Sequence, residues 1–182
     1  MPTLTEDTQL GGQKLSRIVF SAEEIASRIT ELGQEISETY SASDRLLVLG
    51  LLKGSVLFMA DLVRAIHLPL HVDFMVASSY GREKVSSGDV RLLYDAAASL
   101  KGRAVVLVED IIDSGATLSR LLPRLEARGP KSLEVCTLLH KRIATLEPPA
   151  RWVGFDAPNE FLVGYGLDYA EDFRHLPYIA SL

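Results

Sequence analysis

Three carboxylates and a run of small polar residues stand together in the stretch VVLVEDIIDSGATL, residues 105–118. Glu109 and Asp110 end an apolar run, and Asp113 follows after two isoleucines. Adjacent carboxylates at the end of a buried strand can accept hydrogen bonds from the hydroxyls of a sugar, or hold Mg²⁺ together with its waters. Successive side chains on a strand point to opposite faces, so both acids reach one ligand only if the strand loosens at its end.

The residues that follow the acids are suited to an anion. Ser114, Gly115 and Thr117 are small, and a helix is predicted directly after them. The first amides of a helix have no partners inside it and can bind a phosphate, while a glycine lets the backbone approach closely. The Gly-Lys-[Ser/Thr] sequence of a Walker loop is absent. The alternative is that Asp113 and Ser114 only cap the following helix.

Strands and helices are predicted to alternate along the chain, and they must position these residues. The pattern favours an α/β fold with a mostly parallel central sheet flanked by helices, in which ligands bind beyond the carboxyl ends of strands. Ser21 and Glu24 have the spacing of a capping box at the start of the first helix. Pro123 is expected to kink the third helix or to mark its first turn. Helices are predicted at 20–40, 54–66 and 117–129, and strands at 46–52, 70–78, 104–110, 132–141, 152–155 and 161–169.

Length and composition favour a single domain over residues 1–182. The net charge of -5 predicts no basic face for a nucleic acid. No apolar run is long enough for a membrane span, and the polar start of the chain does not resemble a signal peptide. The one cysteine, Cys136, lies in an apolar run and excludes an internal disulfide, so we expect a cytoplasmic protein with Cys136 in its core.

The stretch 105–118 resembles the phosphoribosyl-diphosphate motif of the type I phosphoribosyltransferases. Other stretches are similar, in the same order, to the hypoxanthine (hypoxanthine-guanine) members of that family. The resemblance implies that family's fold, with a small hood formed by the chain termini. It also implies purine salvage: Mg²⁺-dependent transfer of the 5-phosphoribosyl group from phosphoribosyl diphosphate to hypoxanthine or guanine, giving IMP or GMP and pyrophosphate. The similar stretches are LGLLKGSVLFMADL at 49–62, SSYG and SSGDVRLLYD within 78–95, LLHKR at 138–142 and FLVGYGLDYAEDFRHLPYI at 161–179.

The resemblance also implies which residues bind phosphoribosyl diphosphate. Glu109 and Asp110 would hold the ribose hydroxyls and Mg²⁺. Lys53 and Gly54, following a cis Leu52–Lys53 peptide, would bind pyrophosphate together with Arg174. The alternative for Lys53 is a solvated lysine in front of a helix. The loop for the 5′-phosphate would consist of Ser114, Gly115, Ala116, Thr117 and Leu118, with Ala116 contributing only its amide.

The purine-binding residues implied by the resemblance are Lys141, Phe161, Leu162 and Asp168. An ammonium group has only donors, so Lys141 would select an oxo group at position 6 over the amino group of adenine. Phe161 would stack on the base, and the Leu162 backbone would read its edge. Asp113 would be the catalytic residue that accepts the proton at N7.

Several of these residues also have an alternative, purely structural interpretation. Asp168 would also approach a Mg²⁺ through water, but with Arg174 it could instead form a surface ion pair. Phe161 could belong to the core, and Lys141 could be part of a charged strand end. Trp152 is expected to pack near the base-binding end of the fold.

The segment 78–94 resembles the family's mobile loop, in which Ser79 and Tyr80 would close over phosphoribosyl diphosphate. The alternative is an exposed hairpin. The family resemblance implies a homodimer or homotetramer.

Two other functions remain open from the residues alone. One is a transferase acting on another 6-oxopurine such as xanthine, because backbone groups read position 2 of the base. The other is a non-catalytic nucleotide sensor that regulates transcription through RNA or DNA, although the acidic composition argues against it.

Overall fold

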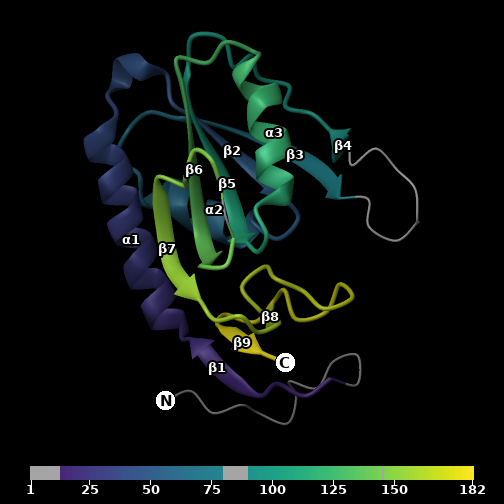
Figure 1. Ribbon diagram of the computed structural model, residues 1–182. Helices are drawn as coiled ribbons and strands as arrows, with labels where there is room; N and C mark the ends of the chain where they lie inside the picture. The colour runs from purple at the N-terminus through teal and green to yellow at the C-terminus, as the bar shows by residue number, and fades with distance from the viewer. Residues whose placement is uncertain (1–12, 80–89, 145) are drawn as a thin grey trace.

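The computed structural model describes residues 13–79, 90–144 and 146–182 (Figure 1). A six-stranded sheet in the order β4-β3-β2-β5-β6-β7 forms the centre of the fold. β4 pairs antiparallel with β3, and the other neighbours in the sheet pair in parallel. The strands are β2 (Leu47–Leu52), β3 (His71–Ser79), β4 (Val90–Tyr94), β5 (Ala104–Ile112), β6 (Ser132–Lys141) and β7 (Trp152–Ala157).

Helices cover both faces of this sheet (Figure 1). α1 (Ala22–Thr39) and α2 (Val56–Ala65) share a hydrophobic cluster with one face, whereas α3 (Ala116–Glu126) packs on the other. The predicted capping box at Ser21 and Glu24 is present at the start of α1. Pro123 lies inside α3, not in its first turn.

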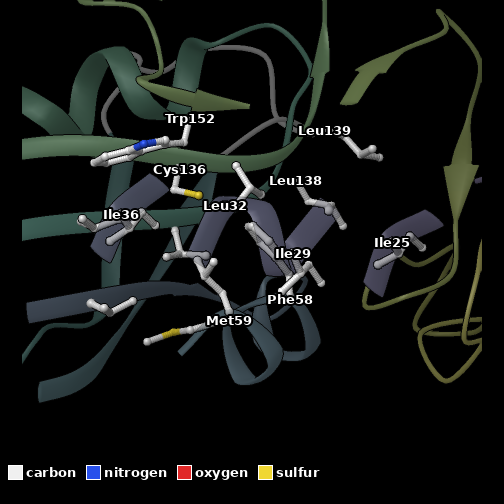
Figure 2. Close-up of a cluster of buried hydrophobic side chains, with 14 of the residues drawn as sticks. Ile25, Ile29, Leu32, Ile36, Phe58, Met59, Cys136, Leu138, Leu139 and Trp152 are labelled. Atoms are coloured by element: carbon white, nitrogen blue, oxygen red, sulfur yellow. The ribbon is translucent and has the colours of Figure 1, made fainter. Parts of the chain in front are cut away.

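The inward stripe of α1 fills the space between helix and sheet. Ile29, Leu32 and Ile36 belong to one cluster with Cys136 of β6 and Phe58 of α2 (Figure 2). The burial of Cys136 confirms the prediction from its apolar surroundings. Truncating one such residue to alanine typically costs about 2–5 kcal/mol, so this layer anchors the strands that carry the site.

A second, smaller sheet forms the hood that the family resemblance implied. Its order is β1-β9-β8, and both of its pairings are antiparallel. The hood lies beyond the carboxyl ends of β5, β6 and β7 (Figure 1). Phe20 stacks on Phe155 of β7, with ring centroids 4.3 Å apart. The hood strands are β1 (Arg17–Phe20), β8 (Leu162–Val163) and β9 (Ile179–Ser181).

The structure confirms the α/β fold and corrects two local predictions. Only Leu162–Val163 of the predicted strand 161–169 is a strand, because Gly164, Tyr165 and Gly166 turn the chain at positive φ values of 97°, 47° and 97°. Trp152 pairs with Cys136 at the amino-terminal start of β7, so it lies at the opposite end from Lys141 and the site.

The predicted mobile loop 78–94 is described only at its two ends. β3 runs to Ser79, and β4 begins at Val90, with these two residues paired antiparallel. The two ends of the loop are therefore paired strands, and the choice between a mobile loop and an exposed hairpin stays a prediction. The rest of that loop, residues 80–89 including Tyr80, lies outside the described residues. Across the described part of the chain, no helix is both long and apolar enough to cross a bilayer.

Candidate active site

Four segments distant in sequence meet at the carboxyl edge of the large sheet. The loop 113–118 follows β5, the turn 53–55 follows β2, and β6 ends at Lys141. The hood adds the segment 161–176. Parallel strands end at the same edge, so this convergence follows from the topology of the sheet.

Glu109 and Asp110 lie on the last part of β5, in a poorly solvated position. Burial raises the pKa of the Glu109 carboxyl well above its ordinary value, and the neighbouring charge of Asp110 raises it further. Burial likewise raises the pKa of Asp110. Asp110 Oδ1 accepts a hydrogen bond from the Ile111 amide at 2.9 Å. Glu109 Oε2 is buried and has no hydrogen-bond partner within the described residues, so it can accept a hydroxyl or bind a cation.

The loop after β5 encloses a small cavity of about 80 Å³, lined by Glu109 and residues 111–118. α3 begins at Ala116, and its N-cap is Gly115 at φ 75°, without a side-chain cap. The first amides of α3 therefore have no acceptor inside the helix. Ser114 Oγ accepts only a long bond from the Ala116 amide, at 3.4 Å. Asp113 does not cap α3, so the capping alternative is wrong for that residue.

A larger cavity of about 440 Å³ adjoins the first, and both are lined by Glu109 and Thr117. The turn after β2 forms one wall, where the Leu52–Lys53 peptide is cis, as the resemblance implied. Gly54 packs tightly on the acids, because a Cβ at this position would lie 1.6 Å from Asp110 Oδ2. Only glycine fits there.

Arg174 enters this cavity from the hood. Its Nη1 donates to the Gly166 carbonyl at 2.7 Å, and its Nη2 pairs with Asp168 Oδ1 at 2.7 Å. The alternative prediction of an ion pair between Asp168 and Arg174 is therefore confirmed. The pair lines a cavity, however, and both side chains are largely covered, so it is not an ordinary surface pair. The Nε atom of Arg174 is buried without a hydrogen-bond partner in the described part of the chain.

The purine end of the predicted site lies at the end of β6. Lys141 Nζ is 2.9 Å from Asp113 Oδ1, and the lysine side chain is only 11% exposed. Phe161 is 54% exposed and meets only the edge of the Tyr169 ring, at a centroid distance of 5.7 Å. The alternative that Phe161 belongs to the core is therefore wrong. Leu162 is buried in β8.

The oxygen donors fit Mg²⁺ better than a softer metal. No group of three or more His, Cys, Asp or Glu side chains in the described residues forms a complete metal site. Mg²⁺ commonly binds through one or two carboxylates plus waters and substrate phosphates. Asp168 lies on the same cavity as Glu109 and Asp110, so an ion there can be shared between carboxylates and a phosphorylated ligand.

Sequence reasoning missed some residues of this site. Glu171 lines the larger cavity and pairs with Lys53 at 3.0 Å. The Lys53 side chain is 64% exposed, so it is solvated as the alternative expected, and it is also paired with Glu171. Gly166 also touches the site, because a Cβ on it would lie 2.0 Å from the Gly54 carbonyl. Both belong to the stretch FLVGYGLDYAEDFRHLPYI, but no local pattern within that stretch brings them near Lys53 and Gly54.

Similarity to known proteins covers most of the chain. A family model described as "Phosphoribosyl transferase domain" matches residues 18–170. The chain is 46% identical to a hypoxanthine-guanine phosphoribosyltransferase of Dictyostelium discoideum, covering 91% of this chain and 94% of the relative. It is 51% identical to the hypoxanthine phosphoribosyltransferase of Escherichia coli K12, covering 87% and 90%. A solved hypoxanthine phosphoribosyltransferase from Staphylococcus aureus matches with a TM-score of 0.85 and 40% identity, covering 92% of this chain and 91% of that one.

Proposed function

The chain belongs to the phosphoribosyltransferase family, in its hypoxanthine (hypoxanthine-guanine) branch, and from this membership we propose the reaction that it catalyses and the residues responsible. It transfers the 5-phosphoribosyl group of phosphoribosyl diphosphate to hypoxanthine or guanine. The bond from C1′ to the diphosphate oxygen breaks, a bond from C1′ to the base nitrogen forms, and pyrophosphate leaves. The product is a purine ribonucleotide, so the role is salvage of a free base.

One observation links this reaction to the larger cavity. Two residues that line it, Glu109 and Arg174, each have a buried polar atom without a hydrogen-bond partner in the described residues, Oε2 and Nε respectively. Buried polar atoms are normally hydrogen-bonded, so a bound ligand with suitable polar groups is expected at this position. A sugar that carries hydroxyls and a diphosphate supplies both. The hydroxyls would go to Glu109 and Asp110, and the diphosphate to Lys53, Gly54 and Arg174.

The 5′-phosphate would bind in the small cavity, against the amides of residues 114–118 and the hydroxyls of Ser114 and Thr117. A helix start is electrostatically suited to an anion. Glu109 and Asp110 would hold the ribose close by and favour the positive charge that develops on it. Glu109 and Asp110 would hold Mg²⁺ together with the ribose hydroxyls, and Asp168 would approach a Mg²⁺ through water. When bound, the ion would neutralise charge on the departing diphosphate.

The base would bind at Lys141, Asp113 and Phe161. The O6 and N7 atoms of an oxopurine lie on the same edge of the base. A donor at Lys141 Nζ beside an acceptor at Asp113 Oδ1 suits a 6-oxopurine whose N7 carries a proton. Asp113 would take that proton as the base attacks C1′. The exposed face of Phe161 would stack on the purine, and the Leu162 backbone would read its edge.

We also propose that the segment 78–94 closes over the substrate, with Ser79 and Tyr80 toward phosphoribosyl diphosphate. The supporting observation is that Val76 and Ala77 of β3, which leads into the segment, line the larger cavity. Closure would keep water from the oxocarbenium-like sugar.

A cytoplasmic homodimer or homotetramer is the assembly that we propose. The free, buried Cys136 suits a reducing compartment. Leu93 and Tyr94 of β4 are large and exposed, which suits a contact with another subunit. Light scattering after size exclusion would give the number of subunits, and a monomer at micromolar concentration would contradict the proposal.

A turnover assay tests the function directly. The protein is mixed with Mg²⁺, phosphoribosyl diphosphate and each of hypoxanthine, guanine, xanthine and adenine, and nucleotide formation is followed. We expect product from hypoxanthine and guanine, and none at a comparable rate from adenine. Product from xanthine at the rate of hypoxanthine would move the assignment to a broader 6-oxopurine transferase. No nucleotide from any base would refute the enzyme assignment.

A further inference from the structure

Glu171 bridges the two cations that the proposed function assigns to pyrophosphate. Its Oε1 atom lies 3.0 Å from Lys53 Nζ, and its Oε2 atom lies 3.2 Å from Arg174 Nη2. One carboxylate therefore occupies both cations, with a different oxygen on each. All three side chains line the larger cavity. Lys53 and Glu171 are 118 positions apart in sequence, so this contact exists only in the folded chain.

The backbone around Glu171 holds the carboxylate in this place. Ala170 and Glu171 adopt left-handed conformations, at φ 53° and 73°, which non-glycine residues rarely do. The Glu171 amide donates to Asp168 Oδ2 at 2.8 Å, and Tyr169 and Asp172 close the turn by hydrogen bonds in both directions. Two successive left-handed residues persist only where their surroundings enforce them. The turn thus places the carboxylate at the cavity, although the Glu171 side chain is 64% exposed.

We propose that Glu171 is an internal competitor of the diphosphate: it pairs with Lys53 and Arg174 until phosphoribosyl diphosphate displaces it, and it returns as pyrophosphate leaves. This inference rests on the proposed function, since it concerns the same cavity. A diphosphate carries more charge than a carboxylate and so displaces it from the two cations. In the empty site the carboxylate keeps both cations oriented, and after the reaction it replaces the contacts that pyrophosphate must give up.

The proposal predicts that removing the charge improves substrate binding. In Glu171→Gln the side chain keeps its size but loses its attraction for Lys53 and Arg174. We expect the KM for phosphoribosyl diphosphate, and the Kd for pyrophosphate measured by calorimetry with Mg²⁺, to fall by roughly two- to tenfold, the scale of one or two exposed ion pairs. The difference from the wild type should shrink at high ionic strength. The KM for hypoxanthine should stay unchanged, because the base binds at Lys141 and Phe161.

Two variants control for charge and for general effects. Asp172→Asn removes one negative charge from the same turn, and among the described residues no ion pair involves Asp172. Glu31→Gln removes a distant glutamate that pairs with Arg28 on α1. Both should leave the Kd for pyrophosphate within a factor of about two of wild type, since neither contacts Lys53 or Arg174.

The outcomes separate this inference from the proposed function. A wild-type protein that forms no nucleotide and binds no pyrophosphate refutes the function, whatever the variants do. An active wild type with an unchanged or higher KM for phosphoribosyl diphosphate in Glu171→Gln overturns only the role of Glu171. The same holds if Asp172→Asn tightens pyrophosphate binding as much as Glu171→Gln does, because the effect would then be general electrostatics.

Discussion

At the scale of single residues, the site holds groups that folding by itself does not favour. Glu109 places a carboxylate beside Asp110 in a poorly solvated position, and its Oε2 atom has no partner in the described residues. The buried Nε atom of Arg174 also has no hydrogen-bond partner in the described residues. Unsatisfied buried polar atoms cost stability, and such costs concentrate where a protein binds a ligand.

Replacing Glu109 should therefore stabilise the fold and lower the activity. We expect Glu109→Gln to raise the free energy of unfolding of the metal-free protein by roughly 0.5–2 kcal/mol, because a neutral amide is easier to bury than a carboxylate. Activity should fall, since the ribose loses an anionic partner. Urea unfolding at pH 8 and steady-state kinetics measure the two effects. A variant that is less stable than wild type would show that Glu109 is satisfied in the free protein.

Asp113 offers a second test at this scale. In Asp113→Asn the size is kept, but the side chain can no longer take a proton, so kcat should fall by about 10²–10⁴-fold with a much smaller change in the KM for the base. Asp156→Asn is the matched control, because Asp156 is also an exposed aspartate in an ion pair with a basic residue, Arg142. Equal turnover in Asp113→Asn and wild type would remove Asp113 from the chemistry.

At the scale of elements, the site depends on how closely the hood approaches the turn after β2. The Gly166 position packs against the Gly54 carbonyl, and Gly54 in turn packs against Asp110. The Tyr165 hydroxyl donates to Asp61 of α2, the helix that follows this turn. Arg174 is held to the same hood turn by its bond to the Gly166 carbonyl. The spacing of hood, turn and acids is thus set by close approaches at the two glycines and by these side-chain hydrogen bonds.

Gly166→Ala should widen this spacing. A Cβ would lie 2.0 Å from the Gly54 carbonyl, and the residue also has a positive φ of 97°. We expect a loss of more than about 1 kcal/mol of stability, together with a several-fold rise in the KM for phosphoribosyl diphosphate. Gly102→Ala is the control: Gly102 has a positive φ of 68°, but no atom lies within 4 Å of its Cβ position. If both variants raise the KM equally, backbone strain at a positive φ causes the rise, and the contact with Gly54 does not.

At the scale of the whole molecule, the two edges of the large sheet have different tasks. The carboxyl edge carries the unsatisfied atoms and cavities described above. The opposite edge carries stabilising ties: Arg103, before β5, donates to the carbonyls of Arg45 and Leu46, and Lys131, before β6, pairs with Asp44 at 2.5 Å. These ties stabilise the end of the sheet that lies opposite the site.

The Asp44–Lys131 tie predicts part of the acid response. The hydrogen bond from Lys131, with those from Ser41, lowers the pKa of Asp44 from 3.8 to about 2. Because the folded state binds the proton less readily than the unfolded state, this stabilisation is complete above about pH 4 and is lost as the pH falls toward 2. Asp44→Asn should therefore lower stability at pH 7 and flatten its decline between pH 4 and 2, as measured by circular dichroism. Identical acid profiles for variant and wild type would contradict this expectation.

Local patterns were enough to predict most of the large sheet. The apolar runs that became β2, β5 and β6 depend on neighbours in sequence. The strands β1, β4 and β9 were not predicted, since each is short and is stabilised by a partner elsewhere in the chain. β1 and β9 pair residue 17 with residue 181, and no local period reports such a contact.

The sequence by itself determined the chemistry available at the end of β5: three acids followed by a loop with free amides, because spacing along one strand and one helix start is a local property. The tertiary structure alone decided that Glu171 lies between Lys53 and Arg174, and that Phe161 faces outward from the hood. The contact between Lys53 and Glu171 joins residues 118 positions apart. Such a contact is set by the closure of the whole fold, which no single stretch encodes.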